Sequence, residues 1–226
     1  MGPDRRAGVG RTRALMPRTA QHKAQTRRKI LDETVRTLRR GGLHSVRVHQ
    51  IMHEAGLTHG GFYAHFASRE ALLAEAASEM SAESDALARL LRHPGPPAEA
   101  LAGFLDHYLS PAHCERSQGA CALPILLPDA DELPPAGRAS ALRLASRLTE
   151  ALAQRLSDLG RGSPHDLARR LLAEVIGLIT LARAQPTRSA RTRLLAQARD
   201  DLASAYGVPL IPSPTAPSPG PEAQAG

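Results

Sequence analysis

The sequence of 226 residues lacks tryptophan and contains only three phenylalanines, three tyrosines and two cysteines. It has no apolar run of roughly 18 residues or more, so no membrane-spanning helix is predicted. The basic N-terminus has no apolar stretch of the kind that a secretory signal needs, so we expect a cytoplasmic protein. In a reducing compartment the two cysteines are expected to be thiols rather than a structural disulfide.

Motifs that would carry enzymatic chemistry are missing as well. The sequence has no glycine-rich phosphate loop, no nucleophile elbow and no cysteine pairs at zinc spacing. His49 and His53 lie one helical turn apart and are a possible metal pair, but no third ligand is placed beside them. We therefore expect no enzyme, no metal and no cofactor.

The formal net charge of +7 is unevenly distributed. Residues 1–29 hold nine basic residues and one acidic residue, a formal charge of +8, so the rest of the chain is close to neutral. Residues 1–22 are poor in apolar side chains, and we predict a disordered basic arm there. A basic segment of this kind is typical of nucleic-acid binding, although a solvated tail would have the same composition.

The most informative stretch is residues 45–66. Val48, Ile51 and Met52 form an apolar stripe at helical spacing, Gly56 can end that helix, and Thr58 can begin another. The second helix is short and contains Gly60 and Gly61, so tertiary contacts must hold it in place. Two helices joined by a turn that contains glycine are typical of a helix-turn-helix, although a surface hairpin without a partner would share the pattern.

Residues 42–72 resemble the DNA-binding signature of the tetracycline-repressor (TetR) family of bacterial regulators. The residues that carry the resemblance are Gly42, Val48, Ile51, Ala55, Gly56, Leu57, Thr58, Phe62, Tyr63, His65, Phe66, Ser68, Arg69, Glu70, Ala71 and Leu72. The resemblance covers the first third of the chain. It implies a dimer whose fourth helix links the DNA-binding part to a ligand-binding part. The sequence departs from the family at Arg47, where a capping threonine is usual, so we expect Ser45 to substitute or the helix start to fray.

We assign DNA contacts to both helices of this pair and their flanks. The residues are Arg47, His49, Gln50, Thr58, His59, Gly60, Gly61, Tyr63, His65 and Arg69. His59 is the main candidate for reading bases because it is the long polar side chain at the start of the second helix. Tyr63 and His65 are expected to bind phosphate, which positions the protein without specifying sequence. Phe62 and Phe66 are expected in the core.

The predicted fold is all-α, with a three-helix DNA-binding head over residues 23–67 and a helical ligand-binding and dimerisation body over 68–207. Helical periodicity predicts further helices over 26–40, 68–91, 97–111, 121–127, 134–159, 164–184 and 190–206. The helix over 164–184 is apolar almost all round and should be buried, with Ser163 as its cap. Together with the helix over 190–206, it could pack on a copy of the same pair as a four-helix dimer interface, or serve a monomer core. Residues 208–226 are a Pro-rich tail that we predict to be disordered.

The predicted function is that of a repressor that binds a palindromic double-stranded DNA operator as a homodimer and leaves it when a small apolar or aromatic effector binds. Candidate effector-lining residues are Phe104, His107, Tyr108, Cys121, Leu144, Leu148 and Ile176, although ordinary core packing explains most of them equally well. One alternative is a repressor that senses oxidants or electrophiles through Cys114 and Cys121. Another is a non-specific architectural DNA binder that uses the basic arm.

Overall fold

The computed structural model describes residues 18–115 and 120–209, and every regular element in these two ranges is a helix. The all-α prediction is confirmed. The α-helices are α1 (Arg18–Gly41), α2 (Val48–Glu54), α3 (Arg69–Glu83), α4 (Asp85–Arg92), α5 (Pro97–Tyr108), α6 (Pro111–Cys114), α7 (Leu123–Leu126), α8 (Pro135–Asp158), α9 (Pro164–Arg183) and α10 (Arg188–Tyr206). Three short 3₁₀ helices complete the set: η1 (Leu43–Ser45), η2 (His59–Ala64) and η3 (Ala130–Glu132).

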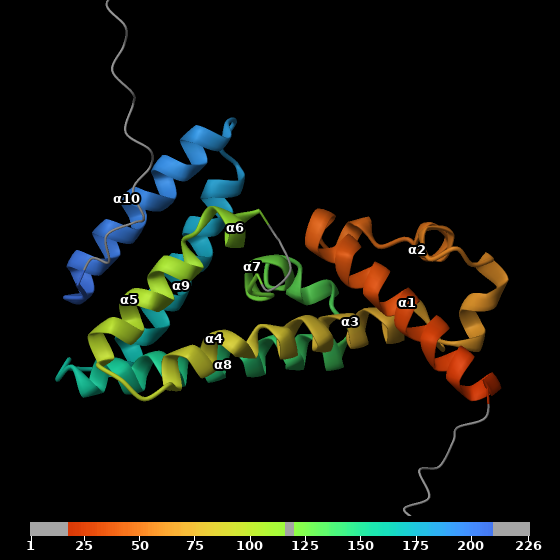
Figure 1. Cartoon of the computed structure of the whole chain (residues 1–226), viewed down its shortest axis with the longest axis horizontal. Coiled ribbons are helices and arrows are strands. Elements are labelled where there is room, and N and C mark those ends of the chain that lie inside the picture. Colours follow the sequence, from red (N-terminus) through yellow and green to blue (C-terminus); the bar gives the residue numbers. More distant parts are fainter. Residues whose placement is uncertain (1–17, 116–119, 210–226) are drawn as a thin grey trace, which may run out of the picture.

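The molecule is elongated, and the part predicted to be a DNA-binding head, called the head below, lies at one end (Figure 1). The head contains α1, η1, α2 and η2, while α3 runs from it into the body beside α8. Helices α5, α9 and α10 form the opposite end, and α7 lies between them and α1. Buried apolar side chains form one cluster that extends from Ile30 in α1 to Val208 after α10. The head and the body therefore share a continuous core.

The close approach of α3 and α8 depends on a glycine. Gly137 lies on α8, and a Cβ placed there would be 3.3 Å from the Cβ of Ala77 and 3.4 Å from the Cα of Ala74. Small residues on both helices thus allow the two backbones to pack closely along the middle of the molecule. Any larger side chain at this position would force the two helices apart.

The first helix is longer than predicted. It begins at Arg18, so residues 18–22, assigned above to a disordered arm, are helical. Residues 20–25 are exposed and include alanine, glutamine and lysine, which favour helix without needing a buried face. Composition alone therefore misjudged this segment. Residues 1–17 of the predicted arm and 210–226 of the predicted tail lie outside the described residues. Val208, assigned to the tail, is buried in the core.

The single helix predicted over 68–91 is two helices, α3 and α4, that meet at Ser84. The Ser84 hydroxyl donates to the Met80 carbonyl at 2.7 Å and accepts from the Ala122 backbone N–H at 2.9 Å. Serine that bonds back to its own helix competes with the regular backbone ladder. The break between α3 and α4 therefore accompanies a tertiary contact with Ala122, which the spacing of residues along the chain does not reveal.

Helix α9 is not buried on all sides, contrary to the prediction. Leu181 is 58% exposed, and Ile176 and Leu178 are half-buried. Ser163 does not adopt the extended backbone of a cap but a left-handed conformation, with φ 51° and ψ 53°. An exposed apolar strip therefore remains on α9. Within the described ranges, no helix is long and apolar enough to cross a lipid bilayer.

Candidate DNA-binding surface

The turn between α2 and η2 is fixed by backbone hydrogen bonds around one glycine. Gly56 has φ 73°, its N–H donates to the His53 carbonyl at 2.9 Å, and the Leu57 N–H donates to the Met52 carbonyl at 2.8 Å. This pair of bonds is the Schellman arrangement, which ends a helix and requires a left-handed residue at that point. The predicted role of Gly56 is confirmed. The turn sets the direction in which the next element leaves α2.

That next element is a 3₁₀ helix rather than the predicted α-helix. Its first turn closes with the Gly61 N–H donating to the Thr58 carbonyl at 3.1 Å. Two adjacent glycines and a length of six residues favour the tighter and shorter helix. Phe62 and Phe66 are buried as predicted, and their stacked rings, with centroids 5.9 Å apart, hold η2 against the core.

With those two rings turned inward, η2 presents its other side to solvent. Thr58, His59 and Gly60 are exposed, Gly61 is half-buried, and Tyr63 is 71% exposed. Polar side chains at the start of the second helix of a helix-turn-helix are the ones placed to reach base edges. These five residues, which we call the η2 edge, therefore lie together on one exposed surface.

Helix α2 adds a second set of exposed polar residues. Arg47, His49 and Gln50 are exposed, and the Gln50 amide donates to the Glu54 carboxylate at 3.0 Å. Arg47 occupies the N-cap position, although its side chain has no acceptor for the first N–H groups of the helix. Ser45 does not substitute for it.

The Ser45 hydroxyl donates instead to carbonyls of Thr37 at 3.1 Å and Gly42 at 2.7 Å, so it secures η1 to α1. Helix α2 nevertheless begins at Val48, where periodicity predicted it. Its start is therefore held by tertiary packing and not by a local cap.

Two predicted DNA contacts are less available than the other residues of this surface: Arg69 is bonded within the protein, and His65 is half-buried. The Arg69 guanidinium donates to the carbonyls of Val46 at 3.1 Å and Leu43 at 3.5 Å, which ties the start of α3 to the segment before α2. The His65 ring is half-buried, and its pKa is lowered by desolvation and by the nearby positive charges of Lys23 and Arg27. A neutral, half-buried imidazole is a weaker phosphate ligand than an exposed cationic one.

Helix α1 supports this surface through arginines that face α3. Arg27 forms a bidentate ion pair with Glu75, and its guanidinium lies 4.4 Å from the centroid of the Phe66 ring. Arg28 pairs with Glu79 at 2.8 Å. These contacts fix the angle between α1 and α3. Because both arginines form ion pairs with carboxylates of α3, their role in this structure is to hold α1 against α3.

A buried acid, which sequence reasoning missed, organises the arginines between α1 and α2. Glu33 is 4% exposed and pairs with Arg36 and with Arg40, the latter at 3.2 Å. Desolvation, followed by the neighbouring Glu54, raises the pKa of Glu33. Helical periodicity places Glu33 on a polar face of α1, which would normally be exposed. Only the tertiary contact with α2 shows that it is buried.

Comparison with known proteins agrees with this geometry. Residues 30–76 match the family model of bacterial regulatory proteins of the tetR family. The head of this chain matches the helix-turn-helix DNA-binding domain of the TetR family. This match supports a DNA-binding regulator of transcription.

Solved structures, two of them of TetR regulators, share the fold over most of the chain. A TetR regulator from Chloroflexus aurantiacus has a TM-score of 0.70 at 21% identity and covers 83% of this chain and 96% of its own. One from Agrobacterium tumefaciens has a TM-score of 0.67 at 20% identity, with 79% and 98% covered. The reduced form of Escherichia coli NemR has a TM-score of 0.63 at 20% identity, with 80% and 97% covered. No curated protein matches the chain significantly.

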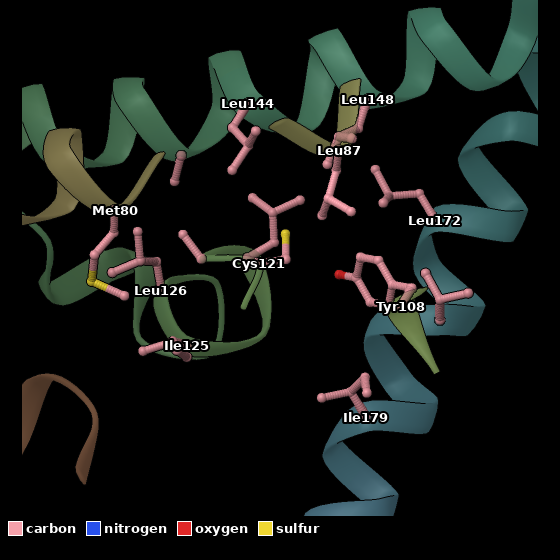
Figure 2. Close-up of a cluster of buried hydrophobic side chains, with 14 of the residues drawn as sticks. Met80, Leu87, Tyr108, Cys121, Ile125, Leu126, Leu144, Leu148, Leu172 and Ile179 are labelled. Atoms are coloured by element: carbon pink, nitrogen blue, oxygen red, sulfur yellow. The ribbon is translucent and has the colours of Figure 1, made fainter. Parts of the chain in front are cut away.

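In the TetR body, the structure brings together five of the seven candidate effector-lining residues. Phe104, Tyr108, Cys121, Leu144 and Leu148 are fully buried in the core, and the Tyr108 hydroxyl points toward Cys121 (Figure 2). His107 is exposed and Ile176 is half-buried. In the described ranges, no group of three or more His, Cys, Asp or Glu side chains is arranged to hold a metal ion.

The TetR body also contains a polar group that sequence reasoning missed. His113 is 3% exposed, its ring centroid lies 4.4 Å from that of Tyr108, and its Nε2 accepts from the Cys121 backbone N–H at 2.7 Å. Nε2 therefore carries no proton, and Nδ1 carries the proton of the neutral ring. Among the described residues, neither His113 Nδ1 nor the Tyr108 hydroxyl has a hydrogen bond of good geometry, and their nearest polar neighbours are the Tyr108 backbone and the Cys121 thiol, respectively. No motif or spacing marks His113, which lies in an irregular segment.

Proposed function

We propose that this TetR regulator is a repressor that binds a palindromic operator as a homodimer and is released by a small effector. The observation that carries the proposal is the η2 edge, where Thr58, His59 and Gly60 are exposed while Phe62 and Phe66 anchor the same element from behind. A rigidly held element with polar atoms on one side is suited to enter a major groove.

The residues of η2 and α2 would have different roles in DNA binding. His59 would read a base edge, and Tyr63, together with Arg47 and His49 on α2, would contact phosphates. Gly60 has a distinct role, because a Cβ placed there would meet no described atom within 4 Å. The fold itself does not require a glycine at this position. Its missing side chain instead suits a close approach of DNA to the backbone.

The exposed strip on α9 supports a homodimer. Leu181 is 58% exposed, Leu178 and Ile176 beside it are half-buried, and α9 packs against α10 on its other side. Burying apolar surface contributes about 25 cal/mol per Å², so a second copy that covers this strip would stabilise both chains. A two-fold pair of heads would then match a palindromic operator.

The effector would bind in the body near Tyr108 and Cys121, where apolar side chains surround the Tyr108 hydroxyl (Figure 2). The His113 ring lies beside that of Tyr108, and its Nδ1 also lacks a hydrogen bond of good geometry. The redox alternative is disfavoured by burial, since Cys114 is 1% exposed and Cys121 is fully buried. Burial also raises the pKa of the Cys121 thiol, which keeps it protonated and unreactive.

The test is selection of bound duplexes from a random DNA pool by the purified chain. We expect an enriched palindrome, whereas unselective binding that vanishes in moderate salt would support the architectural alternative instead. On the selected duplex, Gly60→Ala should weaken binding about tenfold or more with the fold intact. Gly103→Ala in α5, where an added Cβ likewise meets no described atom within 4 Å, is the matched control and should bind within about twofold of the wild type. Equal affinity of both variants would remove Gly60 from the interface.

A further inference from the structure

Residues 120–122 lie between α6 and α7 and are held by three side chains from three different elements. The Ala120 carbonyl accepts from Arg39 Nη1 at 3.0 Å. The Cys121 N–H donates to His113 Nε2 at 2.7 Å, and the Ala122 N–H donates to Ser84 Oγ at 2.9 Å. All three residues of the segment are buried. Each of them is thus tied through its backbone to another part of the molecule.

The three side chains connect the head to the body. Arg39 belongs to α1 of the head, is 4% exposed, and also pairs with Glu83 in the last turn of α3. Ser84 is the junction between α3 and α4. His113 belongs to α6 in the body, beside the ring of Tyr108. The segment therefore contacts the DNA-binding head, the helix that leaves it, and the polar group in the body core.

Such a segment cannot move at one attachment and stay fixed at the others without exposing a buried polar group. A buried donor or acceptor that loses its partner costs about 1–3 kcal/mol. The Ser84 hydroxyl already donates its proton to the Met80 carbonyl, so its oxygen is oriented to accept from Ala122. A displacement of His113 would consequently be passed to Arg39 and Ser84 together.

We propose that residues 120–122, held by Arg39, Ser84 and His113, are the link through which the body controls the position of the DNA-binding head. The proposal rests on the repressor function proposed above and names the residues that carry its regulation. The two unpaired groups, His113 Nδ1 and the Tyr108 hydroxyl, lie at the body end of the link. A ligand that can form hydrogen bonds with them would act on the link there.

The first test compares the buried Arg39 with the half-buried Arg155, which both donate to backbone carbonyls. Arg39→Gln breaks the link, whereas Arg155→Gln removes donors to Leu91 O at 2.5 Å and His93 O at 2.7 Å in the body. The affinity of the full chain for the selected operator is measured by fluorescence anisotropy. Arg39→Gln should weaken binding by roughly 5- to 150-fold, the usual range of coupling between sites, and Arg155→Gln should leave it within about twofold.

A double-mutant cycle shows whether Arg39 and His113 affect operator binding through the same segment or independently. If Arg39 and His113 act through the same segment, Arg39→Gln combined with His113→Leu should bind no more weakly than the weaker single variant. Multiplied losses would mean independent sites and would overturn the link. Should either variant not fold, Ser84→Ala removes a single hydroxyl and should weaken operator binding in the same direction.

Failure of the link is distinguishable from failure of the repressor function. If the wild type selects an operator and Arg39→Gln and Ser84→Ala both bind it like the wild type, the link is wrong and the function stands. If the wild type selects nothing, hydrogen exchange still tests the link. His113→Leu should then accelerate exchange in residues 36–41 of α1, and Arg155→Gln should not. Unchanged exchange in α1 overturns the link without reference to DNA.

Discussion

Two buried tyrosines should respond in opposite directions when their hydroxyl groups are removed. The Tyr108 hydroxyl is completely buried and, among the described residues, has no hydrogen-bond partner stronger than a thiol. Burial raises the pKa of Tyr108 well above its usual value, and its polar neighbour is the Cys121 thiol, a weak partner. The Tyr206 hydroxyl, by contrast, donates to the Glu174 carboxylate at 3.0 Å.

The magnitudes follow from these environments. An unpaired buried hydroxyl costs about 1–3 kcal/mol, so Tyr108→Phe should raise the free energy of unfolding by about 1 kcal/mol or more. A hydrogen bond to a charged group contributes about 1.5–3 kcal/mol, so Tyr206→Phe should lower it by about that amount, less what solvent screening removes at this half-exposed carboxylate. For a chain of this size, each kcal/mol shifts the melting temperature by about 2–4 °C.

The assay is urea unfolding of the full chain, followed by circular dichroism at one protein concentration, because assembly would make stability depend on concentration. Tyr108→Phe should move the midpoint to higher urea and Tyr206→Phe to lower urea, with unchanged slopes. A destabilised Tyr108→Phe variant would show that its hydroxyl has a partner. It would also refute the use of that hydroxyl as an unpaired ligand contact.

Three further predictions concern the DNA surface and the body. His59→Ala should weaken binding to the selected operator more than binding to random duplex, and equal losses in a filter-binding assay would contradict base reading. Desolvation lowers the pKa of His113 to about 3 from its usual 6.5. The unfolded chain therefore binds this proton first, and stability should fall between those pH values by on the order of 1.4 kcal/mol per unit. His113→Gln should flatten that fall in acid-unfolding titrations. Cys114 and Cys121 should resist alkylation by iodoacetamide until urea unfolds the chain, and labelling of the native protein by mass spectrometry would restore the redox alternative.

The elements that were predictable depend on local chemistry. The turn at Gly56, the start of α2 at Val48 and the burial of Phe62 and Phe66 follow from spacing and glycine conformation within a few residues. Ser68 caps α3 in the same local way, since its hydroxyl accepts from the Ala71 N–H at 3.1 Å. In each case, the residues that determine the structure lie within one or two turns of each other, so periodicity and capping rules are sufficient.

Sequence reasoning missed structural features that depend on contacts between distant residues. Arg69 had the charge and position of a phosphate ligand, but its guanidinium is held by carbonyls 23 and 26 residues away. The break at Ser84 depends on Ala122, which is 38 residues away. Helix α9 had the composition of a buried helix, yet one side of it is exposed. The prediction was wrong because composition does not show whether an apolar helix face is covered by the core of the same chain.

Residues 120–122 show why the regulatory half of the chain resists interpretation from sequence. Their side-chain partners lie 81, 8 and 38 residues away, and each bond is made to a backbone group that every residue type offers. No spacing or residue identity at 120–122 could therefore indicate the contact. The η2 edge differs because, as the proposed DNA-reading surface, it would have to match an external surface, the DNA groove, whose dimensions are fixed. A helix-turn-helix consequently leaves a recognisable pattern. A link between head and body needs to fit only other parts of the same molecule, so it can be built from any residues that packing brings together.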